Sequence, residues 1–374
     1  MRILFFSRDY TTHDRRFLQK LAASRHAVFF LRLEDDGIHY VKSPLPEGVK
    51  EIEWKGGRRP IKKTNQLLDL MPSFQSVLDQ IKPDLIHAGP VPTCGFMSAL
   101  AGFHPLLVMS WGSDILVEAD RDDASRWVTQ YTLRHADYFV CDCRAVRDKA
   151  QSIYPIEDSR IVQFPWGIDL ERFPSQNGMS ALRVQLDWQD KFVVLSTRSW
   201  EPIYGIQTLL ESFRRALDKN PLLRLILLGA GSLASYVDEF IESHQLQGAI
   251  HRPGIVSQQE IPSYFRASDL YMSCTLSDGA SISLLEAMAS GLPVLASDAP
   301  GNREWIVNNE NGWLAQPENV ESFSEALLAA SLADLDERKT MARQNRGIAH
   351  QRADWNQNAQ KLLDLYDRIE SQTA

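Results

Sequence analysis

The sequence has few cysteines, and they are scattered along the chain. Only Cys94, Cys141, Cys143 and Cys274 occur among the 374 residues. This number is too small for a disulfide framework, and a single Cys-x-Cys pair without a second ligand pair is a poor zinc signature. We therefore expect four reduced thiols in the core and no metal site.

The chain also lacks a long apolar run and an excess of basic residues. No stretch approaches the apolar length that spans a bilayer, and Met1–Phe6 leads directly into Ser7, Arg8 and Asp9 without a signal-peptide pattern. These absences predict a cytoplasmic protein. The formal net charge of −8 argues against a partner that is a nucleic acid, since proteins that bind nucleic acids usually carry a basic excess.

The first half of the chain alternates short apolar runs with longer amphipathic ones. This alternation predicts strand–helix units and a mostly parallel sheet, so we expect an α/β, Rossmann-like domain. The predicted strands are Ile3–Phe6, Ala27–Leu33, Asp84–His87, Leu106–Ser110, Tyr138–Asp142 and Ile161–Phe164. The predicted helices are Asp14–Ala23, Thr64–Gln80, Pro92–Ala101, Arg121–Arg134 and Val146–Ile153.

The same alternation restarts after a segment rich in proline, glycine and asparagine at 165–178, where we place the linker. We therefore predict an N-terminal domain at 1–170, a second Rossmann-like domain at 171–354, and a terminal helix at 355–374 that returns to the first domain. The predicted strands after the linker are Phe192–Ser196, Leu223–Leu228, Leu270–Cys274 and Val294–Ala296. The predicted helices are Gly205–Lys219, Leu233–His244, Gln258–Ala267, Ser281–Ala289, Val320–Ala333, Asp336–Ala349 and Trp355–Ser371.

The segment 277–294 carries the clearest chemical signal. It follows the buried strand predicted at Leu270–Cys274, and Ser281 begins a helix that Gly291 and Pro293 end. The loop therefore lies at the carboxyl edge of a parallel sheet, where ligands bind and where free N–H groups at a helix start can hold phosphate oxygens. We expect this phosphate site to use Ser277, Gly279, Ala280 and Ser281.

Two acidic residues belong to the same segment. Glu286, in the second turn of the predicted helix, is suited to accept hydrogen bonds from two vicinal ribose hydroxyls, and Asp278 would face the sugar end of the ligand. The alternative for either residue alone is a turn aspartate and a solvated helix glutamate. Their occurrence together, beside Leu284, Leu285 and Met288, favours the site.

This segment resembles the Glu-x7-Glu donor motif of retaining glycosyltransferases of family 4, although Asp278 stands where the family usually has a glutamate. The linker at 164–173 and the glycine loop at 228–232 are also similar to the family's. The resemblance implies the GT-B fold, in which two Rossmann-like domains face each other across a cleft. It further implies that Gly229 and the backbone near Ile255 and Val256 contact the nucleotide.

The resemblance also assigns the segment 196–205, which corresponds to the family's "GR....KG" motif. An arginine and a lysine of that motif neutralise the donor diphosphate in the family. Arg198 is retained, whereas Tyr204 stands about where the lysine is expected. The alternative for Arg198 is a buried structural ion pair with Glu201.

In the N-terminal domain, His87 and Asp114 follow or end predicted strands and should face the cleft. Trp111 replaces a histidine that the family often has near the donor sugar, so Asp114 or His87 is the candidate to orient or deprotonate the acceptor. His13 and Arg16 in the first strand–helix loop are further candidates for acceptor contact. A structural histidine and a polar helix start are the respective alternatives.

The segment 50–63 is basic, and its Trp54 and Ile61 could contact a membrane interface. This suggests peripheral attachment at the inner membrane face. Glu51 and Glu53 dilute the positive charge, so a solvated loop is the alternative for this segment.

The resemblance predicts transfer of a sugar from a nucleotide-diphosphate sugar to a glycan, lipid-linked or small-molecule acceptor. It implies retention of the anomeric configuration and no cofactor or metal requirement. Two alternatives remain open: a nucleotide-sugar epimerase of similar fold, and a non-catalytic nucleotide-sugar-binding protein. The departures at Asp278, Tyr204 and Trp111 motivate the second alternative.

Overall fold

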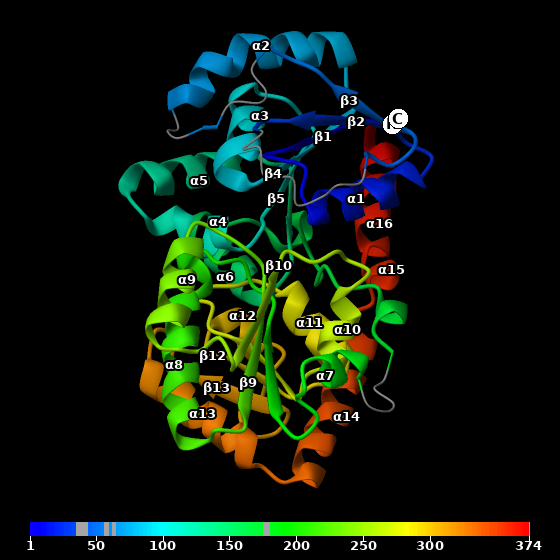
Figure 1. The fold of residues 1–374 in the computed structure, drawn as a ribbon. Coiled ribbons are helices and arrows are strands. Elements are labelled where there is room, and N and C mark those ends of the chain that lie inside the picture. Colours follow the sequence, from blue (N-terminus) through cyan, green and yellow to red (C-terminus); the bar gives the residue numbers. More distant parts are fainter. Residues whose placement is uncertain (35–43, 56–59, 62–64, 175–179, 374) are drawn as a thin grey trace. The chain divides into compact units, whose positions relative to one another are not determined.

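The computed structural model describes residues 1–34, 44–55, 60–61, 65–174 and 180–373. The chain divides into two compact units, each of which has its own sheet (Figure 1). Unit 1 comprises Met1–Pro165 and Gln357–Ala374, and unit 2 comprises Trp166–Asn356. Pro165 is the first residue of the segment predicted as the linker, and residues 175–178 of that segment lie outside the described part of the chain.

Unit 1 is built on a parallel sheet in the order β3-β2-β1-β4-β5-β6-β7. The strands are β1 (Arg2–Ser7), β2 (Ala27–Arg32), β3 (Val49–Ile52), β4 (Leu85–Gly89), β5 (Leu106–Met109), β6 (Tyr138–Cys141) and β7 (Ile161–Gln163). Every strand predicted before the linker is present, and each ladder between neighbours is parallel, as predicted.

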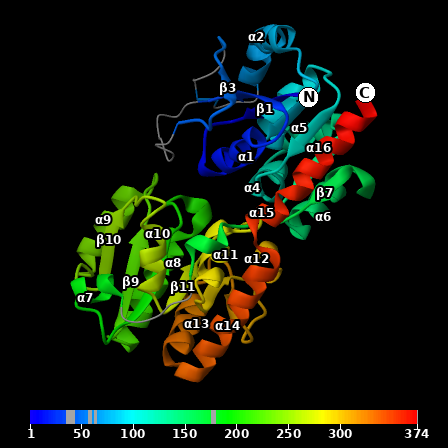
Figure 2. The same cartoon turned by 90° about the vertical axis from the view of Figure 1, so that its right-hand side faces the viewer.

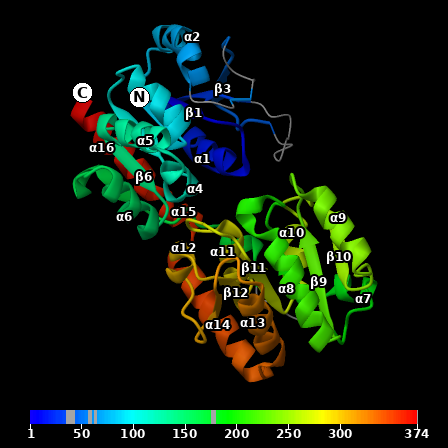
Figure 3. The same ribbon diagram turned by 90° about the vertical axis from the view of Figure 1, so that its left-hand side faces the viewer.

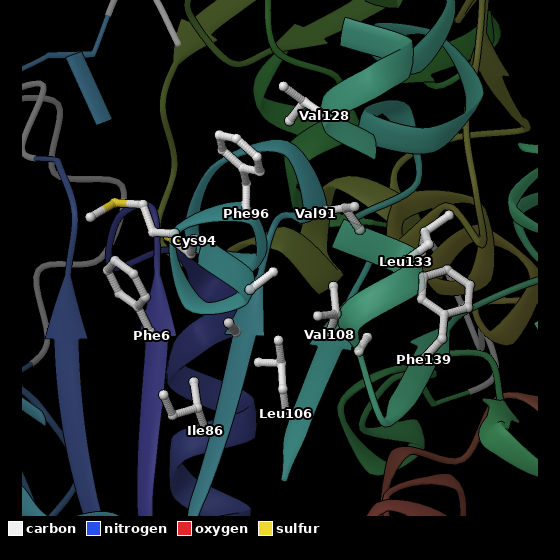
Figure 4. Packing of buried hydrophobic residues seen from close by; sticks show 14 of the residues in the cluster. Phe6, Ile86, Val91, Cys94, Phe96, Leu106, Val108, Val128, Leu133 and Phe139 are labelled. Atoms are coloured by element: carbon white, nitrogen blue, oxygen red, sulfur yellow. The ribbon is translucent and has the colours of Figure 1, made fainter. Parts of the chain in front are cut away.

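Helices cover both faces of the first sheet. They are α1 (Thr12–Ala22), α2 (Asn65–Ile81), α3 (Phe96–Leu100), α4 (Ser113–Leu116), α5 (Asp123–His135), α6 (Arg144–Ile153) and α16 (Gln360–Thr373), with short turns η1 (Val91–Gly95), η2 (Glu118–Asp120) and η3 (Asp158–Arg160). On one face, side chains of α2, α3, α5 and α6 join the core that contains Phe6, Ile86 and Val108 (Figure 4). On the other face, α1 and α16 bury Phe17 and Tyr366 against the sheet, so the terminal helix completes unit 1.

Unit 2 repeats this architecture with a parallel sheet in the order β10-β9-β8-β11-β12-β13. Its strands are β8 (Phe192–Ser196), β9 (Leu223–Leu228), β10 (Ile250–Gly254), β11 (Leu270–Ser273), β12 (Val294–Ser297) and β13 (Gly312–Ala315). Its helices are α7 (Ala181–Gln185), α8 (Ile206–Lys219), α9 (Ala234–Ser243), α10 (Ile261–Arg266), α11 (Ile282–Ala289), α12 (Pro300–Arg303), α13 (Val320–Leu332) and α14 (Leu335–Arg352), with the turns η4 (Leu170–Arg172) and η5 (Pro202–Tyr204). The short helix α15 (Trp355–Asn358) spans the boundary at which the chain returns to unit 1.

Two apolar clusters sandwich this second sheet. One face packs against α8, α9 and α13 through residues such as Phe213, Phe240 and Phe323. The opposite face packs against α10, α11 and α14 through residues such as Phe265 and Leu285. Figures 2 and 3 show these helices on the two sides of the strands. The four cysteines are free and buried, as predicted.

The order of the strands reverses once in each sheet. In unit 2 the chain runs outward from β8 to β10 and then returns to place β11 on the other side of β8, and in unit 1 the reversal lies between β1 and β4. At such a point the loops after two neighbouring strands diverge, which leaves room for a ligand at the carboxyl edge. A ligand site is therefore expected at the residues that follow β8 and β11.

Three strands were missed by the sequence analysis, and all three lie at the outer edges of their sheets. Two of them, β3 and β10, bury few side chains, so their apolar patterns are weak, whereas β13 is short and mostly buried. In β3, Lys50 and Glu51 are exposed, and β10 contains Arg252 and Pro253, which are also exposed. Proline is tolerated in such an edge strand because one side of the strand needs no N–H donor.

The segment 50–63, proposed for membrane contact, includes residues 56–59, 62 and 63, which lie outside the described residues. The apolar residues that motivated the proposal pack against their own unit. Trp54 donates its indole N–H to the Arg32 carbonyl oxygen over 2.9 Å and contacts Phe74, and Ile61 packs on the same core. Both residues are partly buried against unit 1, and membrane contact by this segment stays a prediction. Within the described ranges, none of the helices combines the length and apolar character that crossing a membrane requires.

Candidate functional site

Two loops meet at the carboxyl edge of the second sheet, one after β8 and one after β11. Arg198 follows β8, and its Nη2 lies 3.0 Å from Oδ2 of Asp278 in the loop after β11. The two side chains are only 14% and 17% exposed. The alternative partner, Glu201, instead accepts a hydrogen bond from the backbone N–H of Ser232 over 2.7 Å. The alternative, a structural ion pair between Arg198 and Glu201, does not form, because Arg198 pairs with Asp278.

The guanidinium of Arg198 has further partners at the start of α11. Its Nη1 donates to Oγ of Ser281 over 2.9 Å and to Oγ of Ser283 over 3.3 Å. The ring of Tyr204 lies against the guanidinium, with its centroid 4.1 Å from Cζ. Beneath them, the buried hydroxyl of Tyr271 donates to Oγ of Ser283 over 2.7 Å. A cation is thus fixed beside the first turn of a helix.

Asp278 is held in surroundings that disfavour its charge. Burial raises the pKa of its carboxyl, and the neighbouring Arg198 guanidinium opposes that rise. The loop around Asp278 is also fixed by its backbone: Leu276 donates its N–H to the Ile203 carbonyl oxygen over 2.8 Å. Gly301, at the start of α12, lies so close that a Cβ there would overlap the carbonyl oxygens of Asp278 and Gly279. Glycine is therefore required where these two loops touch.

Helix α11 begins as the sequence predicts, with Ser281 at its N-cap. The Ser281 side chain does not cap the helix, and its Oγ accepts a hydrogen bond from Arg198. The first N–H groups of the helix, after the loop Ser277-Asp278-Gly279-Ala280, consequently keep the partial positive charge that attracts anions. Glu286 lies one turn further along and is 8% exposed, so its carboxylate is positioned by packing.

The remaining predicted donor residues lie in the loops after β9 and β10. Gly229 approaches the Arg198 carbonyl oxygen, which a Cβ would meet at 2.9 Å, and its N–H donates to the Gly254 carbonyl oxygen over 2.9 Å. Ile255 follows Gly254 and is 61% exposed, whereas Val256 packs against the core. The carboxyl edge therefore presents the cation of Arg198, the start of α11 and the apolar side chain of Ile255.

Asp114 in unit 1 accepts hydrogen bonds from other residues of the same unit. Its Oδ1 accepts from the Ser110 hydroxyl over 2.6 Å and from the Trp111 N–H over 3.0 Å, and its Oδ2 accepts from the Val91 N–H over 3.0 Å. Burial raises the pKa of Asp114 to about 6. These bonds join the loops after β4 and β5, so the geometry gives Asp114 a positioning task and does not support acceptor deprotonation.

His87 is a core residue, which corrects its prediction as a site residue. Its Nδ1 shares a hydrogen bond with the Tyr366 hydroxyl on α16, and its ring packs on Phe5. The side chain is fully buried, and burial lowers the pKa of His87 to about 3. Strand β4 continues to Gly89, so His87 lies within the strand rather than at its end. It cannot reach an acceptor from there.

The loop after β1 is built around Asp14, which the sequence analysis did not single out. Asp14 and Thr11 form a capping box at the start of α1, and burial raises the pKa of Asp14 to about 6. His13 lies beside Trp111, with 5.6 Å between the ring centroids. The aromatic ring of Trp111 therefore borders the carboxyl edge near the strand-order reversal of unit 1.

Among the described residues, His26, Asp367 and Glu370 form a group whose ligand atoms could converge on a metal ion. Their charges already have partners. Glu370 accepts from the terminal ammonium of Met1 over 2.9 Å, and Arg25 donates to Asp367 over 2.8 Å. We interpret the group as an ion-pair cluster that attaches α16 to unit 1.

Two family models match this chain, one in each half. The model for glycosyl transferases group 1 matches residues 180–348, and the model for glycosyl transferase 4-like proteins matches residues 2–143. The chain therefore belongs to the group 1, family 4-like glycosyltransferase family, and it has the GT-B fold.

The curated relatives and solved structures carry varied names. The chain is 26% identical over 58% of its length to the alpha-monoglucosyldiacylglycerol synthase of Streptococcus pneumoniae, and 24% identical over 80% to a D-inositol 3-phosphate glycosyltransferase of Paenarthrobacter aurescens. These matches cover 49% and 78% of the relatives, and several matches span about half of the relative or less. The structure of Anabaena Alr3699/HepE in complex with UDP-glucose superimposes with a TM-score of 0.80 at 21% identity, covering 98% of this chain and 100% of that one.

Proposed function

We propose that this glycosyltransferase takes its sugar from a nucleotide-diphosphate sugar that binds unit 2. The observation that carries the proposal is the placement of Arg198 beside the start of α11, at the point where the strand order of the sheet reverses. A fixed guanidinium and free helix N–H groups are the partners that a diphosphate requires. UDP and UDP-glucose bound to a protein of the same fold support the choice of ligand.

The other donor residues take roles that follow from their chemistry. Glu286, positioned by packing, accepts the two ribose hydroxyls, and the exposed Ile255 with the backbone near Val256 contacts the base. Asp278 faces the sugar. Because Asp278 and the diphosphate are both anionic partners of Arg198, binding of the donor draws the guanidinium toward the phosphates and releases the carboxylate for a sugar hydroxyl.

The chemical step breaks the bond between the anomeric carbon and the β-phosphate oxygen, and the acceptor hydroxyl oxygen forms the new bond on the same face of the sugar. The proton of the acceptor hydroxyl passes to the departing phosphate oxygen. The departing diphosphate gains charge as the bond breaks. Arg198 and the N–H groups of α11 stabilise that charge, which is the main electrostatic task of the site. This proposal uses neither a metal ion nor a general acid for the leaving group.

The acceptor is proposed to bind unit 1 at the edge bordered by Trp111 and His13. Asp114 fixes the loops of that edge through its hydrogen bonds and does not touch the acceptor. The names of the relatives include a diacylglycerol glycoside synthase and an inositol phosphate glycosyltransferase. The acceptor class therefore stays at a glycan, a lipid-linked sugar or a small molecule.

A thermal-shift screen of nucleoside diphosphates tests the donor proposal. A ligand that binds the folded protein raises its melting temperature, by an amount that grows with concentration. We expect at least one of UDP, GDP and ADP to raise the melting temperature, and the corresponding monophosphate to do so less. No shift with any of them at millimolar concentration would contradict the proposal. Once a nucleotide sugar that the protein uses as substrate is known, NMR of the product gives the anomeric configuration, which we expect to be retained.

A further inference from the structure

Arg198 is held on three sides. The face of Tyr204 lies 4.1 Å from its Cζ, Ser281 and Ser283 accept from its Nη1, and Asp278 pairs with its Nη2. An arginine side chain has many rotamers, and a single contact would leave most of them accessible. Contacts to the ring face and to both terminal nitrogens restrict the guanidinium to one plane and one direction.

We infer that Tyr204 is a positioning residue that acts through Arg198, an inference that rests on the proposed function. The family resemblance predicts a lysine near this position, which would add a second positive charge. Tyr204 adds no charge. Its ring instead stabilises the existing cation through the negative potential above an aromatic face, and it shields the guanidinium from water. This chain therefore orients one cation where its family uses two.

The backbone holds Tyr204 in place. It ends the short turn η5, which Glu201 and Gly205 flank, and its N–H donates to the Glu201 carbonyl oxygen over 3.0 Å. Gly205 has a φ of +64°, and a Cβ there would overlap the Cys274 carbonyl oxygen. The turn is thus packed directly on the loop that leads to Asp278, so the ring and the carboxylate cannot move apart independently.

The serine partners of Arg198 are themselves held in place by Tyr271. Tyr271 lies fully buried in β11 and donates its hydroxyl to Oγ of Ser283 over 2.7 Å. The hydroxyl oxygens of Ser281 and Ser283 lie 3.3 Å apart, and both accept a hydrogen bond from Arg198. The Tyr271 bond orients the Ser283 hydroxyl so that its oxygen faces the guanidinium. Tyr204 thus contacts the face of the guanidinium while the two serines bind its edge.

Orientation matters because the cation must meet the charge that appears on the departing diphosphate. A guanidinium that already points at that position need not reorganise during the reaction. Preorganised groups of this kind contribute most to catalysis. A loosely held Arg198 would still attract phosphate but would spend more conformational entropy on binding it. The effect of Tyr204 should therefore appear with ligands that reach Arg198 and be absent with ligands that do not.

The test compares three variants, Tyr204→Phe, Tyr204→Leu and Tyr204→Met, by isothermal titration. The probes are the nucleoside diphosphate that wild type binds most tightly among UDP, GDP and ADP, and the monophosphate of the same base. Phenylalanine keeps the ring face, so Tyr204→Phe should stay within about twofold of wild type for both ligands. Tyr204→Leu and Tyr204→Met should bind the diphosphate about five- to tenfold more weakly and the monophosphate within about twofold.

Equal weakening of both ligands would mean that Tyr204 only supports the fold, and it would overturn the inference. The inference would also be overturned if Tyr204→Leu and Tyr204→Met bound the diphosphate as tightly as wild type. The same holds if Tyr204→Phe bound the diphosphate as weakly as Tyr204→Leu. The half-buried position of Tyr204 favours folded variants, and two apolar replacements guard against one that unfolds. If wild type binds none of the three diphosphates, the proposed function fails and the inference fails with it. If wild type binds and Tyr204 has no effect, the inference alone fails.

Discussion

Two of the arginine–aspartate pairs in unit 2 lie at opposite ends of strand β11. Arg183 pairs with Asp269, which precedes β11, and Arg198 pairs with Asp278, which follows it. Both arginine side chains are 14% exposed. The pairs differ in their other partners. Arg183 donates to the Ala267 carbonyl oxygen, and Asp269 accepts from the Val193 N–H, so the backbone saturates this pair.

The second pair has side-chain partners instead, and beyond the ion pair itself Nε of Arg198 and Oδ2 of Asp278 have no hydrogen-bond partner among the described residues. Arg198 meets two serine hydroxyls at the start of α11 and the aromatic face of Tyr204 in η5. Side-chain partners can rearrange when a ligand arrives, whereas a backbone partner in a sheet cannot without unfolding the strand. The comparison indicates that the partners of an ion pair, more than its residue types, determine whether the pair stabilises the fold or belongs to a ligand site.

The largest effect should come from replacing the arginine at the carboxyl edge. Arg198→Gln removes the cation that stabilises the departing diphosphate, and we expect kcat for sugar transfer to fall about 100-fold. Arg183→Gln is the matched control: it should lower the free energy of unfolding by about 1–3 kcal/mol and leave kcat within about twofold. Release of nucleoside diphosphate and urea unfolding measure the two quantities. Equal loss of activity in both variants would remove the distinction between the pairs.

Glu286 sharpens the comparison within the same edge. Glu286→Gln replaces a charged acceptor of two ribose hydroxyls by a neutral one, and we expect the Kd for a nucleoside diphosphate to rise about tenfold. Glu239, exposed on α9, provides the matched control, because Glu239→Gln should leave the Kd unchanged. Calorimetric titration distinguishes the two, and an unchanged Kd for Glu286→Gln would exclude the ribose contact.

Asp114 extends the comparison to unit 1, where an aspartate at a carboxyl edge is saturated largely by backbone N–H groups. Asp114→Asn replaces one accepting oxygen by an N–H₂ donor, and we expect it to lower the free energy of unfolding by about 1–3 kcal/mol. The effect should depend on pH. Burial raises the pKa of Asp114 from its usual 3.8 to about 6, so the folded protein binds a proton that the unfolded chain has released between these values.

The stability that wild type gains from this protonation is complete below about pH 3.8 and is lost as pH rises through 6. The variant does not titrate at this position. The stability difference between wild type and Asp114→Asn should therefore shrink between pH 4.5 and pH 7, which urea unfolding across that range can measure. A difference that widens with pH would show that the charged carboxylate is the favoured form.

The smallest effect concerns the buried pair of His87 and Tyr366. Tyr366→Phe removes the hydroxyl that meets Nδ1 of His87 and should cost about 1 kcal/mol of stability. Sugar transfer should stay within about twofold of wild type, because neither residue reaches the carboxyl edge. A large loss of kcat with unchanged stability would return His87 to the list of site residues.

Local signals predicted a large part of the candidate site. The loop with Asp278, the start of α11 at Ser281 and the turn of Glu286 follow from neighbours within a few residues, and the structure places them as expected. The contact between Arg198 and Asp278 could not be predicted, because it depends on β11 returning beside β8 after two intervening strands. Strand order is a property of the packed sheet that one sequence does not encode locally.

The errors have similar physical origins. His87 was placed at a strand end because the apolar run stops there, yet β4 includes Ala88 and Gly89. Tyr271 and Ser283 were overlooked because a tyrosine in an apolar strand has the pattern of a core residue, and its hydroxyl partner lies on the following helix. The outer strands β3 and β10 were missed since single-sided burial weakens their patterns.

A crystal structure of the full chain with a nucleoside diphosphate tests the central claim most directly. The account predicts the β-phosphate at the first N–H groups of α11, within hydrogen-bond distance of Arg198, and the ribose at Glu286. It also predicts that the Arg198 guanidinium keeps its stacking on Tyr204 while its contact with Asp278 lengthens. A diphosphate bound elsewhere, with the pair of Arg198 and Asp278 intact, would contradict the account.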